Sequence, residues 1–275
     1  MSQISVTTEE KLIDSKKSHT VLRGEILNVT KDKVQVCIDN DRRLRINIPI
    51  IESTLYVPSK IREREDAFNL FIEGYAGSEI AFVVTDIIRD ESGNVTEAKG
   101  SMIEAREIGI KEIKGMNLPA EITVNILLVR DKYMVVEYKG LIQTVGTFAL
   151  AKTEILSMQD YVRENRNNGI DKFVLKGIAN ENVGSMELDR YAILDDEFLE
   201  KINGGEYKEG DCCKGVVTGK DISGRMIIEI EPAISGVAHI PDGLNIDIGA
   251  QIQCLISGVD KAKHRLFLRR IKVLA

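Results

Sequence analysis

The fold is decided by four β-rich stretches near the C-terminus: residues 210–222 (GDCCKGVVTGKDI), 225–240 (RMIIEIEPAISGVAHI), 249–260 (GAQIQCLISGVD) and 264–273 (HRLFLRRIKV). Their apolar residues are mostly β-branched and alternate with polar residues, the pattern of strands that bury one face. The four stretches hold five strands, with a short loop that contains Pro241 and Gly243 before the fourth strand. The pattern therefore predicts a five-stranded unit in residues 206–275.

The same succession of elements occurs twice upstream. Residues 21–29, 33–38 and 44–51 are predicted strands, residues 52–75 suit a loop with a short helix, and two more strands follow in 79–88 and 95–105. From residue 120 the order β-β-β-α-β-β repeats. Five strands with a helix or loop between the third and the fourth are the arrangement of an OB barrel. The sequence thus predicts a mainly β protein of three tandem five-stranded OB-fold barrels with short helices between strands three and four.

Breaks in this pattern set the expected domain boundaries. Residues 1–18 are polar and without a period, so we expect a flexible N-terminal tail. The first OB domain then spans residues 19–110, the second with its linker spans 111–205, and the third spans 206–275. Because Gly204 and Gly205 supply a flexible boundary, we expect the third domain to fold alone.

Composition argues against several classes of protein. The 275 residues carry 37 Lys and Arg against 43 Asp and Glu, and a net charge of −6 does not favour coating of nucleic acid by bulk charge. No apolar run approaches the roughly 18 to 20 residues of a membrane span, and the N-terminus has no apolar secretory segment, so we expect a cytoplasmic protein without a membrane partner. The four Cys and three His show no metal-ligand spacing, and no Gly-rich phosphate loop is present. We expect no metal, no cofactor and no enzymatic activity.

The third cycle also carries landmarks in a defined order, namely Gly210-Asp211, Lys214-Gly215-Val216-Val217, Glu229-Ile230-Glu231-Pro232, Gly236-Val237-Ala238-His239-Ile240, Ile248-Gly249, Val259-Asp260 and Arg265-Leu266-Phe267-Leu268. On these residues it resembles the ribosomal S1 domain, an OB-type RNA-binding repeat, and the two earlier cycles resemble the same family more faintly. The resemblance implies a ribosomal protein S1-like protein that binds single-stranded RNA, such as mRNA in translation, with the ribosome or another protein as a further partner.

Polar and aromatic residues on the predicted strands and turns are candidates for RNA contact. Lysine and arginine reach phosphates, Asn, Gln and His reach base edges, and tyrosine offers a stacking surface. The resemblance places His239 at the position of a histidine on the RNA face, with Gln143 and Asn47 as its counterparts in the earlier repeats. Arg225 and Arg265 are expected to be exposed. The candidates are Lys214, Lys220, Arg225, His239 and Arg265 in the third repeat, Lys132, Tyr133 and Gln143 in the second, and Lys33 and Asn47 in the first.

A second function stays open on the same residues. Domains of the S1 family usually carry two exposed aromatic residues around the start of strand two, whereas residues 223–227 here read SGRMI. Cations on an edge strand also protect against aggregation without binding a ligand. The chain can therefore also be interpreted as a protein-interaction or assembly scaffold whose OB barrels have lost the RNA-binding face. Binding of single-stranded RNA at two salt concentrations separates the two hypotheses, because phosphate contacts weaken as salt rises.

Overall fold

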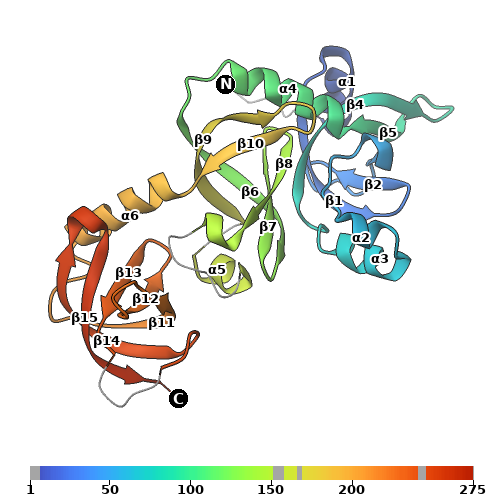
Figure 1. Cartoon of the computed structure of the whole chain (residues 1–275). Helices are drawn as coiled ribbons and strands as arrows, with labels where there is room; N and C mark the ends of the chain where they lie inside the picture. Colours follow the sequence, from blue (N-terminus) through green and yellow to red (C-terminus); the bar gives the residue numbers. More distant parts are fainter. Residues whose placement is uncertain (1–6, 151–157, 166–168, 241–245, 275) are drawn as a thin grey trace.

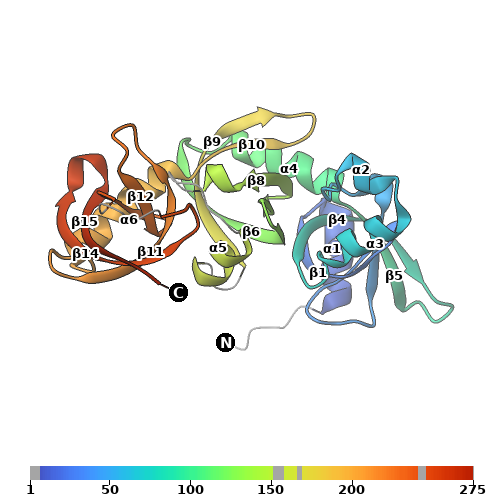
Figure 2. The same cartoon turned by 60° about the horizontal axis from the view of Figure 1, so that its bottom comes forward.

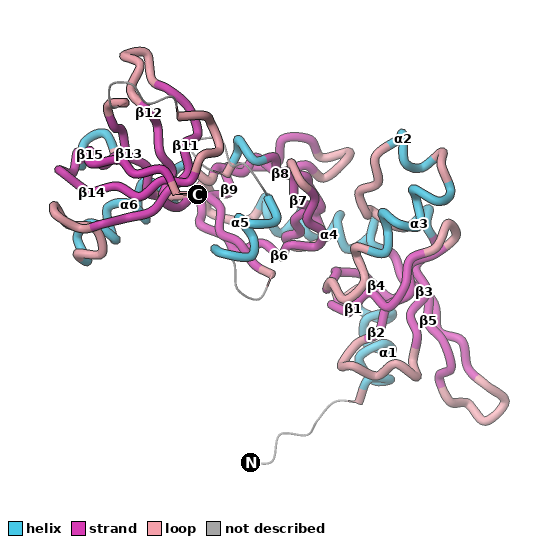
Figure 3. The backbone as a smooth tube through the Cα atoms, turned by 90° about the horizontal axis from the view of Figure 1, so that it is seen from below, coloured by secondary structure: helices cyan, strands magenta, loops and turns pink. Residues whose placement is uncertain are grey.

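The structure is a computed structural model that describes residues 7–150, 158–165, 169–240 and 246–274. It contains three five-stranded β units that follow one another in a row (Figures 1 and 2). Strands make up each unit, and helices lie beside or between the units (Figure 3). The prediction of a mainly β fold with three tandem OB-like units is confirmed.

The first unit is a closed barrel, called barrel 1 below. Its strands follow the order β1-β2-β3-β5-β4, with β3 parallel to β5 and β1 antiparallel to β4. Short helices connect β3 to β4, as the sequence predicts. The elements are β1 (Leu22–Val29), β2 (Lys33–Cys37), β3 (Arg45–Pro49), η1 (Ile50–Glu52), α2 (Ser59–Arg62), α3 (Glu65–Glu73), β4 (Glu79–Arg89) and β5 (Val95–Ser101).

A helix occupies most of the segment that the sequence analysis expects to be a flexible tail. Helix α1 (Thr8–Ser18) begins with a capping box in which Thr7 and Glu10 satisfy each other's backbone N–H groups. Its Leu12 is 1% exposed within the core of barrel 1. The Ser15 hydroxyl also accepts a hydrogen bond from the Val84 N–H of β4 at 3.1 Å. Ion pairs of Lys11 with Asp39 and of Lys16 with Asp86 add to these contacts. The expectation of a flexible tail is therefore wrong for residues 8–18, because this short polar helix is docked on barrel 1.

The second unit, called the middle sheet below, is more open than its neighbours. Its strand order β10-β9-β6-β7-β8 is that of an OB barrel without the closing pair, since β8 and β10 are not hydrogen-bonded as a ladder in the described strands. The pairing of β9 with β10 contains two register shifts, and irregularities of this kind bend a strand away from its neighbours. The elements are α4 (Met102–Lys114), β6 (Ala120–Arg130), β7 (Tyr133–Tyr138), β8 (Leu141–Gly146), η2 (Thr147–Ala149), α5 (Met158–Asn165), β9 (Ile170–Asn180) and β10 (Ser185–Asp189).

The third unit is again a closed barrel, called barrel 3 below. Its order β11-β12-β13-β15-β14 repeats that of barrel 1, and β13 runs parallel to β15. The loop between β13 and β14 includes residues 241–245, which lie outside the described residues. The elements are α6 (Tyr191–Gly204), which precedes the barrel, β11 (Cys212–Lys220), β12 (Met226–Glu231), β13 (Ile234–Ala238), β14 (Gln251–Asp260), η3 (Lys261–Lys263) and β15 (Arg265–Val273).

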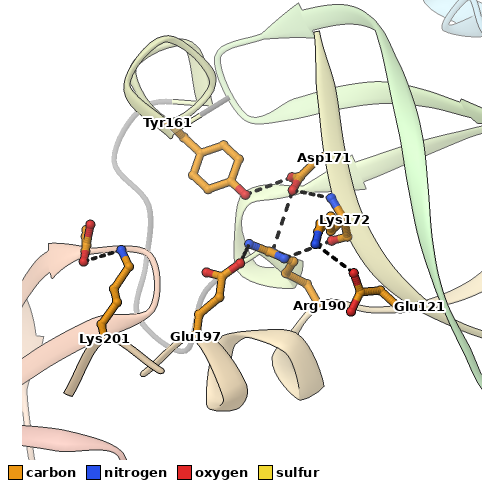
Figure 4. Close-up of polar contacts among 8 residues, drawn as sticks. Glu121, Tyr161, Asp171, Lys172, Arg190, Glu197 and Lys201 are labelled. Carbon is orange, nitrogen blue, oxygen red and sulfur yellow. Dashed lines mark hydrogen bonds and ion pairs between the residues drawn. The ribbon is translucent and has the colours of Figure 1, made fainter. Parts of the chain in front are cut away.

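Helix α6 joins the middle sheet to barrel 3 through contacts with both units. At its start, Arg190 is 1% exposed, and its guanidinium contacts Glu197 at 2.7 Å and Asp171 of β9 at 3.8 Å (Figure 4). Further along, Phe198 is fully buried in the core of barrel 3. Gly205 ends the helix with a left-handed φ of 78°, a conformation that glycine adopts without strain. Residues 204–205 therefore form a helix end and not a flexible boundary.

Candidate nucleic-acid interface

The outer face of barrel 3 carries a row of apolar side chains across three neighbouring strands. Ile227 of β12 pairs with Val237 of β13, and Val237 pairs with Phe267 of β15. The neighbours of Phe267 along the strand, Leu266 and Leu268, are buried in the barrel core. Because side chains alternate along a strand, Phe267 points outward, and 36% of its surface is exposed. The row therefore ends in an exposed aromatic ring.

Basic side chains lie on both sides of this apolar row. The next row in the strand pairing, Met226, Ala238 and Leu268, points into the barrel core. One residue further along each strand, on the outward side again, are Arg225 and His239, which extend β12 and β13 by one residue, and the exposed Arg269 of β15. On the other side Arg265 of β15 places its guanidinium carbon 5.6 Å from the centre of the Phe267 ring. The outward side of β12, β13 and β15 is called the barrel 3 face below. It carries the Phe267 ring and the basic residues Arg225, His239, Arg265 and Arg269.

Two of these cations are held by carboxylates of their own barrel. A guanidinium nitrogen of Arg225 lies 2.6 Å from Asp221, and this contact lowers the pKa of the Asp221 carboxyl. The Nε atom of Arg265 lies 3.7 Å from Asp260. The two arginine side chains are only 24% and 25% exposed, which corrects the expectation that both are exposed. The ion pairs reduce the positive charge that either residue offers to a phosphate.

The other predicted residues of the third repeat are distributed over two sides of the barrel. His239 is exposed at the end of β13, and Lys220 is exposed at the end of β11, where it pairs with Met226 of β12. Lys214 is exposed on β11 beside Gln253 of β14, outside the barrel 3 face. The structure therefore brings His239, Arg225 and Arg265 onto one face and leaves Lys214 apart from them.

Sequence reasoning missed the aromatic residue of the barrel 3 face. The S1 resemblance points to the start of strand two as the place for stacking residues, whereas Phe267 comes from strand five. The signal was present, because Phe267 lies between two leucines in Arg265-Leu266-Phe267-Leu268. An alternating strand that buries both leucines must expose the residue between them.

In the middle sheet, the corresponding face is covered by barrel 1. Leu127, Leu128 and Val135 of β6 and β7 belong to the same apolar cluster as the core of barrel 1. On β7, the Glu137 side chain is fully buried, and its carboxylate accepts a hydrogen bond from Arg23 of β1 at 2.6 Å. A nucleic acid cannot reach this part of β7 while barrel 1 is in place.

Gln143 lies on the core side of β8. It pairs with Val136, and its alternate neighbours Leu141 and Val145 are both buried in the core of the middle sheet. His239 and Asn47, its expected counterparts, lie on outward positions, so the alignment of Gln143 with them is displaced by one residue. A displacement of one residue moves a strand side chain to the opposite face. The Gln143 Oε1 accepts a hydrogen bond from the Met186 N–H of β10 at 2.6 Å, where a closed barrel would have a ladder.

A pocket of about 450 Å³ lies where β8 and β10 are apart, and it is called the seam pocket below. Three residues predicted from the sequence, Lys132, Tyr133 and Gln143, line it together. Tyr56 of barrel 1 also lines it, and its ring meets the Tyr133 ring edge to face at 6.0 Å. Burial raises the pKa of Tyr133, so its phenol is neutral at neutral pH. The remaining lining residues are Thr144, Val145, Gly146, Ala149, Phe173 and Leu188.

In barrel 1 the predicted residues offer less to a ligand. Asn47 is 8% exposed, and its amide oxygen accepts a hydrogen bond from Gln35 at 2.9 Å. The amide nitrogen of Asn47 donates to Glu97 of β5, whereas the residue opposite Asn47 on that strand is Lys99. Lys33 is half-buried at the start of β2, opposite Pro49. This face is polar, contains charged groups of both signs in Glu97 and Lys99, and has the Asn47 amide already engaged within the protein.

No known family model and no curated protein matches the chain. Among solved structures, a multidomain protein with nucleic acid binding domains from Streptococcus pneumoniae is 10% identical, with 90% of this chain and 72% of that chain covered at a TM-score of 0.24. Drosophila Unr CSD456 is 11% identical, with 93% and 98% covered at a TM-score of 0.19. The fold and the candidate sites therefore rest on the chain's own strand order and contacts.

None of the helices in the described residues is long and apolar enough to cross a bilayer. Within the same residues, His, Cys, Asp and Glu side chains do not gather in groups of three or more that could hold a metal ion.

Proposed function

We propose that the chain binds single-stranded RNA through the barrel 3 face. The observation that carries the proposal is the exposed Phe267 ring, which lies between Arg265 on one side and the row of Arg225, His239 and Arg269 on the other. OB folds bind oligonucleotides on the face of strands two and three, which are β12 and β13 in this barrel. An aromatic ring accepts any base by stacking, and nearby cations contact the backbone phosphates.

The three faces differ in what they offer to RNA. In the described structure, the face of the middle sheet is packed against barrel 1, and on the face of barrel 1 the Asn47 side chain is buried and hydrogen-bonded to Gln35 and Glu97. The barrel 3 face also carries carboxylates, since Asp221 and Asp260 pair with Arg225 and Arg265, but it differs in its exposed Phe267 ring. Binding should therefore depend mainly on barrel 3, with little preference for sequence because stacking and phosphate contacts do not distinguish bases.

The S1 resemblance extends this proposal to a biological setting. It implies a non-enzymatic, cytoplasmic protein that contacts mRNA, with the ribosome or another protein as a partner. The overall charge of −6 is compatible with local binding, since Arg265 and Arg269 lie on the same strand as Phe267. A local cluster of cations steers a polyanion even when the whole chain is acidic.

The proposal is tested by fluorescence anisotropy with a 5′-labelled single-stranded RNA and the full chain. Phe267→Ala should weaken binding by about 5- to 150-fold, the equivalent of about 1 to 3 kcal/mol for one stacked base. Val273→Ala is the matched control, because Val273 is an exposed apolar residue at the far end of the same strand. Binding of the unchanged chain should also weaken as salt rises.

Equal affinity of the Phe267→Ala and Val273→Ala variants, with both folded by circular dichroism, would place RNA elsewhere. Absence of RNA binding by the unchanged chain at low salt would favour a different function, an assembly scaffold. The observation in favour of that second function is the outer face of β7, where Val135 and Glu137 already serve as a contact between two OB units. A scaffold would use the remaining faces in the same way.

A further inference from the structure

The seam pocket exists because the middle sheet lacks the closing pair of an OB barrel. In barrel 3 the closing strands approach closely at Gly236, where a Cβ atom would lie 2.5 Å from a Leu268 side-chain carbon and 3.2 Å from the Leu266 carbonyl oxygen. The middle sheet has the long side chain of Gln143 on the core side of β8 instead. That side chain spans the gap to Met186 and leaves the space beside it open.

The lining of the seam pocket has an apolar floor and an aromatic corner. Phe173 and Val145 belong to the core of the middle sheet, and Leu188 packs against that core. At the rim, Tyr56 and Tyr133 stand at 82° to each other, so a flat ring can stack on one of them while it meets the edge of the other. A pocket of about 450 Å³ with these walls fits a planar ring system, since binding sites for small molecules typically measure 300 to 1,000 Å³.

The polar groups of the seam pocket add two chemical requirements. Gln143 uses its Oε1 for the Met186 N–H, which leaves its amide N–H groups to donate to the edge of a ligand ring. Lys132 is exposed at the rim, and none of the described carboxylates is within ion-pair distance of it. An ammonium group without an internal partner favours an anionic ligand. The ligand should therefore combine a flat ring, a hydrogen-bonding edge and a negative charge.

We propose that the seam pocket binds a nucleotide, with its base against Tyr56 and Tyr133, the edge of the base at Gln143, and its phosphate at Lys132. Such a base comes either from a free nucleotide or from single-stranded RNA, and only in the second case does the inference rest on the proposed function. The site lies outside the barrel 3 face, so it does not depend on Phe267. It also gives a role to the two tyrosine rings that the fold leaves at this rim.

Isothermal titration calorimetry of the full chain with AMP, GMP, CMP and UMP tests the pocket directly. At least one monophosphate should bind, and ribose 5-phosphate, which lacks a base, should bind at least tenfold more weakly. Equal binding of ribose 5-phosphate would overturn the proposal, because the base would then contribute nothing. Absence of binding by all four monophosphates would overturn it as well.

Three variants locate the binding. Lys132→Ala should weaken it about two- to fivefold, as expected for one exposed charge contact. Gln143→Glu keeps an acceptor for the Met186 N–H but loses the amide donors, so it should weaken binding about two- to tenfold without opening the seam. Thr144→Trp places an indole at the exposed rim and should abolish binding. Lys111→Ala, an exposed lysine on α4, is the control and should change nothing.

A second experiment measures the affinity of the same variants for a labelled single-stranded RNA and identifies the source of the base. A loss of RNA affinity in Thr144→Trp assigns the base to RNA, whereas unchanged RNA affinity together with lost monophosphate binding assigns it to a free nucleotide. Monophosphate binding that survives in Lys132→Ala, Gln143→Glu and Thr144→Trp would place the site elsewhere and overturn the proposal. Loss of RNA binding in Phe267→Ala alone concerns the barrel 3 face and leaves the result for the pocket intact.

Discussion

Replacing Phe198 with alanine should destabilise barrel 3, although Phe198 precedes that barrel in the sequence. The side chain is fully buried in the barrel core, and its ring packs edge to face against His264 with the ring centres 5.4 Å apart. Truncation of a buried phenylalanine to alanine costs about 3 to 5 kcal/mol of unfolding free energy. Because about 1.4 kcal/mol corresponds to a tenfold change in an equilibrium constant, the barrel should open roughly 100- to 4,000-fold more often.

Native-state hydrogen exchange with mass spectrometry measures this opening unit by unit. Amides of β14 should exchange faster by the factor above in Phe198→Ala, while amides of β4 in barrel 1 provide an internal reference and should not change. Glu200→Ala is the matched control, since Glu200 is exposed two residues further along the same helix. A change of less than tenfold in β14 would show that α6 contributes little to the barrel core. It would then support the simpler expectation that residues 206–275 fold alone.

Three other changes test separate parts of the structure. Arg190→Met should cost about 3 to 5 kcal/mol in urea unfolding because it leaves the buried Asp171 carboxylate without its cation, and adding Asp171→Asn should recover part of that loss. Arg269→Ala should reduce the slope of log affinity for single-stranded RNA against log salt by about 0.7, and an unchanged slope would mean that Arg269 does not meet a phosphate. The Cys213 and Cys254 sulfurs lie 3.4 Å apart, and their hydrogen bond lowers the pKa of Cys213, so diamide should oxidise the pair to one disulfide, faster at higher pH. Mass spectrometry detects the loss of two hydrogens, and the same product in Cys213→Ser would contradict the pairing.

Local patterns were sufficient to predict the strands and their repetition. Alternation along β14 and β15 distinguishes buried from exposed positions within one strand, as at Leu266, Phe267 and Leu268. The sequence pattern does not reveal helix α1, because its apolar content is low and its contacts with barrel 1 come from Leu12, Ser15 and ion pairs of charged side chains. A short helix of this kind is not stable on its own, so its existence depends on docking.

The candidate sites were predictable only in part. The sequence predicts Lys132, Tyr133 and Gln143 as contacts on an outward face, whereas the structure brings them together at a pocket. Gln143 reaches Met186 across 43 positions of the chain. No local pattern in either strand reports whether two segments so far apart will pair.

The sequence by itself determined the β-strands, their number in each repeat and the order of the three units, because these depend on short-range periodicity and turns. Tertiary structure decided which barrels close, which faces stay uncovered and which cations are already paired. Closure of the middle sheet depends on the contact of β8 with β10, and the coverage of β7 depends on the docking of Leu128 and Val135 against barrel 1. Closure of the middle sheet and coverage of β7 both depend on packing between segments that are distant in the sequence. Burial and charge pairing are determined by which residues are neighbours in space, and these need not be neighbours in the chain.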